Sequence, residues 1–307
     1  MSLDTYLKEL ADESEPLREA RLTSLSRLTK AERDLLAEMW PSFHPARRQH
    51  ILSNLTSLAE ENIELDFTLI FQLGLNDTSP EVRALAIQGL WECEDRWLIS
   101  SLIQLLRNDP AEKVRAAAAI GLGRFALLAE LGKLLDKDSA ALMNVLLETI
   151  QDGRETTEVR RRAVEALAPL NLAQTKEIIS KAYESADIKM RASALYAMGR
   201  NCDPQWLPLL HQALESREPE LRYEATIACG ELGDEASVPY LAPLTEDPDP
   251  DVQLCAVHAL GSIGGALARK ALMRCIESSD DKVREAATEA LSNMEAEENP
   301  SGFTLRN

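Results

Sequence analysis

The 307-residue sequence is poor in aromatic residues, which make up 5% of it, although hydrophobic residues reach 45%. Alanine and leucine therefore carry most of its apolar content. Because sheets are enriched in aromatic and β-branched residues, this composition favours closely packed helices. A chain of this length is long for one compact core but ordinary for an elongated array of repeats.

Positive charge is also scarce, because 33 Lys and Arg face 51 Asp and Glu and leave a net charge of −18. Nucleic acids and anionic membranes are bound by concentrated Lys and Arg. We therefore expect no nucleic acid and no membrane as partner. A nucleic-acid-binding solenoid stays as a disfavoured alternative that would need a local basic groove.

The five cysteines form no C-x-x-C pair, and their odd number in a chain of this size implies no disulfide framework. The opening residues, MSLDTYLKEL, show no basic region followed by an apolar core. No apolar run approaches the length of a membrane span. Together these absences predict a cytoplasmic protein.

One helical pattern recurs seven times, with apolar anchor residues spaced 32, 45, 31, 31, 31 and 31 residues apart. The anchors are Val82, Val114, Val159, Met190, Leu221, Val252 and Val283. Arginine follows six of these anchors, alanine stands four residues after every anchor, and a larger apolar residue stands eight after. Offsets 0, 4 and 8 share one face of an α-helix, so the pattern predicts a buried stripe that lets two helices approach closely.

Proline and glycine punctuate the pattern. Four prolines suit the first turn of a helix: Pro80, Pro110, Pro219 and Pro250. Three glycines nine residues after an anchor are predicted helix ends: Gly123, Gly199 and Gly261. A further apolar helix precedes each anchor, and Pro208 and Pro243 should distort two of these first helices.

The motif D-x-x-P-x-V-R-x-x-A-x-x-A-L-G has its best copies in DPAEKVRAAAAIGLG and DPDPDVQLCAVHALG. It resembles HEAT-like repeats of the PBS-lyase type, which occur in phycobilisome lyase subunits and many bacterial scaffold proteins. The resemblance implies an all-α, right-handed α-α superhelix, a HEAT-like solenoid of about seven to eight helix pairs. In such repeats the arginine after the anchor pins one repeat to the next.

The repeat pattern divides the sequence into four expected segments. Residues 1–20 form a flexible acidic segment, and residues 21–64 form a degenerate repeat or cap in which Arg48 takes the arginine position. The regular repeats occupy residues 65–294, with an insertion, FALLAELGKLLDKD, at 125–138. Residues 295–307 are an expected disordered tail.

Catalytic chemistry finds little support in the sequence. HEAT-like repeats also build deoxyhypusine hydroxylase, whose iron site uses His-Glu pairs, but glutamate follows none of His44, His50, His211 and His258. The four histidines are too scattered for a zinc site. Cys229 and Cys255 lie in or beside core columns, and no phosphate-binding loop occurs. We therefore predict no enzyme activity, no metal and no cofactor.

The predicted function is a non-catalytic scaffold that binds another protein through its concave face. In this repeat type the second helix of each pair, the one that carries the anchor, lines that face. Aromatic residues and arginine are enriched at interface hot spots. Exposed positions of the second helices give the predicted partner-binding residues: Arg124, Arg161, Arg162, Tyr196, Arg200, Tyr223, Glu224 and His258. The alternative is a subunit of a bilin-lyase-like complex or of a chaperone complex for a chromophore protein.

Overall fold

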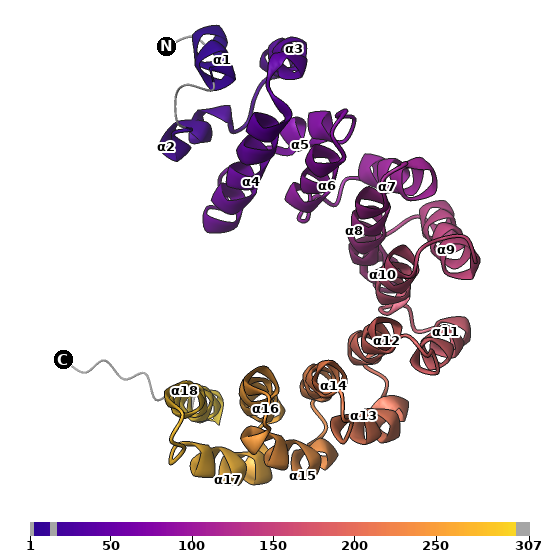
Figure 1. Cartoon of the computed structure of the whole chain (residues 1–307), viewed down its shortest axis with the longest axis vertical. Coiled ribbons are helices and arrows are strands. Elements are labelled where there is room, and N and C mark those ends of the chain that lie inside the picture. Colours follow the sequence, from indigo (N-terminus) through magenta and orange to yellow (C-terminus); the bar gives the residue numbers. More distant parts are fainter. Residues whose placement is uncertain (1–2, 13–16, 299–307) are drawn as a thin grey trace, which may run out of the picture. The chain divides into compact units, whose positions relative to one another are not determined.

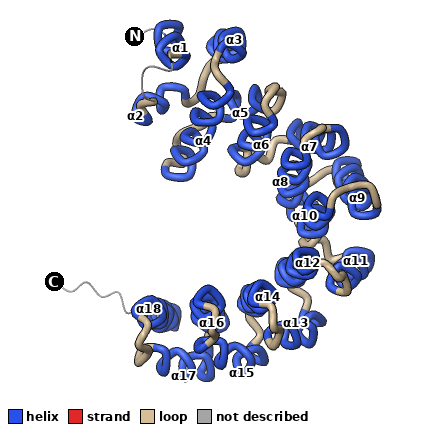
Figure 2. The backbone as a smooth tube through the Cα atoms, viewed as in Figure 1, coloured by secondary structure: helices blue, strands red, loops and turns tan. Residues whose placement is uncertain are grey.

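The computed structural model describes residues 3–12 and 17–298, which are helical with short connections and contain no β-strand (Figures 1 and 2). The all-α class is therefore confirmed. The chain divides into two compact units, Met1–Ala166 and Leu167–Asn307. The predicted tail, residues 295–307, begins inside the last helix, and its residues 299–307 lie outside the described part.

The described part of the first unit begins with four α-helices that precede the regular pairs, and the unit ends within α10. Its α-helices are α1 (Leu3–Ala11), α2 (Glu19–Leu22), α3 (Lys30–Met39), α4 (Pro45–Glu61), α5 (Thr68–Gly74), α6 (Pro80–Gly89), α7 (Arg96–Asn108), α8 (Glu112–Glu130), α9 (Asp136–Gln151) and α10 (Thr157–Leu167). Helix α6 packs on α4 and α8, while α5 and α7 pack on α6 and α8 respectively. This is the stacking of helix pairs that the anchors predict.

The second unit repeats the arrangement. Its α-helices are α11 (Ala173–Tyr183), α12 (Ile188–Asn201), α13 (Leu207–Leu214), α14 (Pro219–Leu232), α15 (Val238–Leu241), α16 (Pro250–Ile263), α17 (Gly265–Cys275) and α18 (Asp281–Glu298). Helices α12, α14, α16 and α18 pack in one row, with the first helices of the pairs in a second row (Figure 1). We call the solvent side of α12, α14 and α16 the second-helix face.

The anchor stripe forms the core of both units. The seven alanines four residues after the anchors are each 0% exposed, and all seven anchors are buried. At offset 8 the stripe is buried from Leu90 to Leu260, but Leu291 on α18 is only half-buried. Among the described residues no helix pair follows α18, so its outer side lacks a neighbour that would cover this position.

The predicted glycine helix ends are wrong. Gly123, Gly199 and Gly261 all lie inside α8, α12 and α16. Their role is close packing: a Cβ on Gly123 would lie 3.2 Å from the Cα of Ala166, and one on Gly261 would lie 2.9 Å from the Cβ of Ala290. Each of these glycines therefore faces an alanine of the next second helix, and the absent side chain permits the short interhelical distance.

The two prolines inside first helices act as predicted. A 3₁₀ turn, Pro204–Trp206, precedes α13, so Pro208 stands at the start of a shortened α-helix. Helix α15 is a single turn that gives way to a second 3₁₀ segment, Ala242–Glu246, which contains Pro243. A proline without an N–H cannot continue the α-helical hydrogen-bond ladder, which accounts for both interruptions.

The residues of the expected insertion lengthen α8 rather than form a separate helix. Helix α8 runs on to Glu130, and α9 begins at Asp136. Within this extension the side chains of Phe125 and Leu128 are buried, whereas Leu131 and Leu135 in the following turn are exposed. The extra residues thus add helix length within one repeat and displace the start of the next first helix along the sequence.

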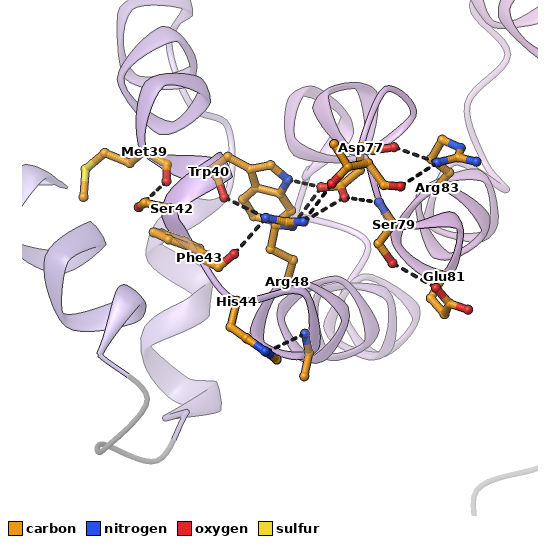
Figure 3. Close-up of polar contacts among 12 residues, drawn as sticks. Met39, Trp40, Ser42, Phe43, His44, Arg48, Asp77, Ser79, Glu81 and Arg83 are labelled. Atoms are coloured by element: carbon orange, nitrogen blue, oxygen red, sulfur yellow. Dashed lines mark hydrogen bonds and ion pairs between the residues drawn. The ribbon is translucent and has the colours of Figure 1, made fainter.

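Arg48 makes a buried polar clamp between α4 and the loop that precedes α6 (Figure 3). Its Nε lies 2.9 Å from Asp77 Oδ2, and the two side chains are 5% and 2% exposed. Arg48 also donates to the Phe43 carbonyl at 2.7 Å. Asp77 in turn accepts from the Trp40 indole at 2.7 Å and from the Ser79 N–H at 2.8 Å. Arg48 therefore performs the task expected of a repeat arginine in the degenerate repeat.

The same clamp recurs further along the chain, which confirms the structural role expected of the repeat arginines at three positions. The pairs are Arg83 with Asp109, Arg115 with Glu155, and Arg222 with Asp247. In each pair two guanidinium nitrogens donate to both carboxylate oxygens at 2.7–2.9 Å. The remaining nitrogen donates to a backbone carbonyl of its own repeat, so each arginine joins two neighbouring repeats.

The other repeat arginines bind differently within the described residues. Arg160 donates to the Ile150 carbonyl at 3.0 Å, and Arg191 lies over the Tyr183 ring at 5.5 Å. Arg284 donates to the Ser278 carbonyl at 2.8 Å and pairs with Asp281. The carboxylate clamp is therefore a feature of some repeat junctions and not of all of them.

Candidate protein-binding site

The predicted binding residues of the first unit are held in local ion pairs. Arg124 on α8 donates to Glu94 at 2.9 Å and to the Trp91 carbonyl. On α10, Arg161 and Arg162 both contact Glu158 and Glu165, for example Arg162 Nη1 to Glu165 Oε2 at 2.8 Å. These three predicted binding residues are therefore arginines that already pair with carboxylates of this chain.

The predicted residues of the second unit lie along its second-helix face. Tyr196 and Arg200 belong to α12, Tyr223 and Glu224 to α14, and His258 to α16. The tyrosines are 38% and 37% exposed, and His258 is exposed as well. Arg200 pairs with Glu231 of α14 at 3.3 Å. The structure therefore presents two aromatic side chains and an imidazole to solvent on three consecutive second helices.

A groove of about 480 Å³ lies between the exposed sides of α14 and α16 on this face. Its lining comes from the first turns of both helices and the turns that follow: Pro219, Glu220, Tyr223, Asp249, Asp251, Leu254, Cys255 and His258. Two of the predicted residues, Tyr223 and His258, therefore line the same depression. The described residues also contain a smaller cavity of about 220 Å³, which Arg27, Asp66 and Phe67 line far from the predicted residues in the sequence.

The acidic lining of the groove escaped the sequence-based prediction, whose residues all stand two, three, six or ten positions after an anchor. Glu220 and Asp251 each stand one residue before an anchor. Asp249 is the N-cap of α16, where its Oδ1 accepts from the Asp251 and Val252 N–H groups at 3.0 and 3.3 Å. A comparison of the charges of the residues before the anchors, made from one repeat to the next, could have revealed Glu220 and Asp251 as two acidic residues in succession.

Burial and negative charge shape the ionisation of the groove. Burial raises the pKa of the Cys255 thiol to about 12, and the carboxylate of Glu224 adds to this shift. Burial likewise raises the pKa of Tyr223, with further contributions from Cys255, Glu224 and Asp251. Cys255 is therefore a protonated thiol at neutral pH, which is the opposite of an activated nucleophile.

Other chemistry-bearing groups give no assembled centre in the described part of the chain. Burial raises the pKa of Cys229 to about 11. Residues 3–12 and 17–298 contain no group of three or more His, Cys, Asp or Glu side chains placed to hold a metal ion. Among the described helices, none combines the length and the apolar character needed to cross a membrane.

Comparison with known families identifies the repeat. The family described as HEAT repeats matches residues 69–148, 175–253 and 207–292, and the chain therefore belongs to the HEAT repeat family. The predicted resemblance is thus confirmed. No curated protein gives a significant sequence match.

Solved structures that are similar to this chain have low sequence identity to it. The complex of CpcE and CpcF of phycocyanin lyase from Nostoc sp. PCC7120 is 16% identical, with a TM-score of 0.55 over 92% of this chain and 97% of that chain. An engineered protein is 22% identical, with a TM-score of 0.44 over 64% and 96% of the two chains. Human deoxyhypusine hydroxylase is 17% identical, with a TM-score of 0.37 over 95% and 97%. The likeness to the lyase complex shows a common HEAT-like solenoid fold.

Proposed function

We propose that this protein is a non-catalytic scaffold that binds another protein through the second-helix face. The observation that carries the proposal is the groove between α14 and α16, which Tyr223 and His258 both line. A rigid helical framework with exposed aromatic side chains beside a depression suits the anchoring of a partner's side chains. Tyr196 and Arg200 on α12 extend the proposed contact surface next to it.

The arginines of the first unit have a secondary place in the proposal. Arg161 and Arg162 can exchange their local carboxylate partners for a partner's acidic groups only at the cost of existing ion pairs. Arg124 is engaged in the same way. The tyrosines of the second unit therefore make the sharper test, because truncating them removes exposed contact area without breaking one of these ion pairs.

The test is a capture experiment from a lysate of the source cells with three immobilised forms of the protein. These are the wild type, a Tyr196→Ala/Tyr223→Ala variant, and a Tyr240→Ala control. Tyr240 lies on α15 in the other row and is 42% exposed, so the control removes a comparable side chain from the opposite side. Circular dichroism should show that all three forms are folded.

The proposal predicts a protein that the wild type and the Tyr240→Ala control retain and the double variant loses. Equal retention by all three forms would contradict the assignment of the second-helix face. A bound pigment, visible in the absorbance spectrum of the captured material, would instead favour the alternative of a subunit in a chromophore-protein complex. The likeness to phycocyanin lyase concerns the fold and adds no lyase activity to this proposal.

A further inference from the structure

The residue that precedes each anchor carries a charge in all seven repeats. These residues are Glu81, Lys113, Glu158, Lys189, Glu220, Asp251 and Lys282. The sign alternates from one repeat to the next with a single exception, the step from Glu220 to Asp251. That step is the one across the groove between α14 and α16, and both carboxylates belong to its lining.

The first unit shows what the alternation does. Glu81 on α6 and Lys113 on α8 form an ion pair between neighbouring second helices. The hydrogen bond from Lys113 is the main cause that lowers the pKa of Glu81 to about 2. Lys113 thus reaches across to the acidic residue of the preceding repeat, and among the described residues it is the one lysine at this position that does so.

At the groove no cation plays this part. In the described part of the chain, neither Glu220 nor Asp251 forms an ion pair, and the lining contains no lysine or arginine. Acidic residues favour the first turn of a helix, which could explain each carboxylate alone. However, Lys113, Lys189 and Lys282 occupy the same position, so the fold does not require an acid there.

We infer that the groove between α14 and α16 binds a lysine or arginine side chain of the partner protein, which pairs with Glu220 and Asp251. This inference rests on the proposed scaffold function and specifies the chemistry of the partner. The partner's cation would take the place that Lys113 has beside Glu81. Tyr223 adds an aromatic ring to the lining. The face of such a ring attracts a cation, so it would add to the attraction of the two carboxylates.

The electrostatic environment supports a cationic occupant. Besides Glu220 and Asp251, the neighbouring carboxylate of Glu224 adds, after burial, to the raised pKa values of both Tyr223 and Cys255. Asp249 contributes a third carboxylate at the N-cap of α16. A groove lined by several carboxylates attracts a positively charged side chain and repels an acidic segment.

The experiment titrates the whole protein with the peptide acetyl-Gly-Lys-Gly-Arg-Gly-amide and monitors the histidine side chains by NMR. An uncharged counterpart, with norleucine for lysine and citrulline for arginine, keeps the shape and removes both charges. Of the four histidines, His258 lines the groove and the other three lie outside it, so they serve as internal controls. We expect the charged peptide to shift the His258 resonance in a saturable way, and the uncharged peptide to leave it unchanged.

Two variants locate the cation. Glu220→Gln/Asp251→Asn preserves the size of both side chains and should raise the dissociation constant at least about tenfold. Asp251→Lys should abolish binding without lowering thermal stability, because the new lysine can pair with Glu220 of the preceding repeat as Lys113 pairs with Glu81. Equal shifts with both peptides, shifts of equal size at all four histidines, or unchanged affinity in the neutral variant would each overturn the inference.

The lysate experiment separates this inference from the proposed function. If Tyr196→Ala/Tyr223→Ala loses the captured partner while Glu220→Gln/Asp251→Asn keeps it, the scaffold function stands and the cationic inference fails. If the neutral variant loses the partner as well, both are supported. If both variants keep the partner, the assignment of the binding site to the second-helix face is wrong.

Discussion

Gly199 of α12 lies directly against Ala228 of α14, because a Cβ placed on the glycine would come within 2.8 Å of the alanine Cα. We predict that Gly199→Ala destabilises the protein by about 1–3 kcal/mol, the usual cost of overpacking. This loss should appear although alanine is favoured over glycine inside a helix by about 1 kcal/mol. Denaturant unfolding followed by circular dichroism measures it.

The matched control is Gly153→Ala in the loop after α9, where an added Cβ would meet no atom within 4 Å. We expect its stability to stay within about 0.5 kcal/mol of the wild type. A Gly199→Ala variant as stable as this control would mean that α12 and α14 can separate freely. The close approach would then have no role in fixing their spacing.

The clamp arginines should differ in importance from the other repeat arginines. Arg222→Ala leaves Asp247, whose side chain is 3% exposed, without its bidentate partner. Removing one partner of a buried pair typically costs about 3–5 kcal/mol. Arg191→Ala removes the same residue type one repeat earlier, but only its contact with the Tyr183 ring is lost, at a cost of about 0.5–1 kcal/mol. Comparing their unfolding midpoints checks this prediction, which equal losses in the two variants would contradict.

The Arg222–Asp247 clamp should also give stability a defined pH dependence. Burial alone would raise the pKa of Asp247, but the hydrogen bonds from Arg222 and the Asp249 N–H outweigh it and lower the pKa below its ordinary value of 3.8. The unfolded state therefore binds this proton more readily, and the clamp's contribution is fully present above pH 3.8. It is lost as the pH falls through the lower pKa of the folded state.

Asp247→Asn isolates this carboxylate. The wild type should be more stable than the variant at neutral pH, and the difference should shrink once the pH drops below 3.8, because a protonated aspartic acid resembles asparagine. Unfolding curves of both proteins at several pH values give the difference. A difference that stays constant into strong acid would show that the charge of Asp247 contributes nothing.

Much of the fold could be predicted from the sequence because a repeat shows each structural position several times. The alanine at offset 4 recurs seven times, and helical geometry alone places it on the buried stripe. The role of Gly199 could not be found in this way. Glycine is common at helix ends, and only the position of Ala228 on the next helix reveals the close contact.

The candidate site was predictable in part for a similar reason. Helical offsets correctly gave the exposure of Tyr196 and Tyr223. They could not give the ion pairs of Arg161 and Arg162 with their neighbours, since these depend on side-chain conformations. The acidic pair Glu220 and Asp251 becomes meaningful only when the structure places both residues in one groove.

The two cysteines Cys202 and Cys255 offer a test of the non-catalytic interpretation. Cys202 is exposed at the C-terminal end of α12, whereas Cys255 is half-buried and burial raises the pKa of its thiol to about 12. Because only the thiolate attacks iodoacetamide, we predict that Cys202 is alkylated at least about tenfold faster than Cys255 at neutral pH. Peptide mass spectrometry over a time course measures both rates, and a Cys202→Ser variant confirms the assignment.

The denatured protein should lose the difference in alkylation rate, since unfolding exposes both thiols. Faster alkylation of Cys255 than of Cys202 would reveal an activated thiolate in the groove, and a nucleophilic role would then have to replace the scaffold function proposed for this face.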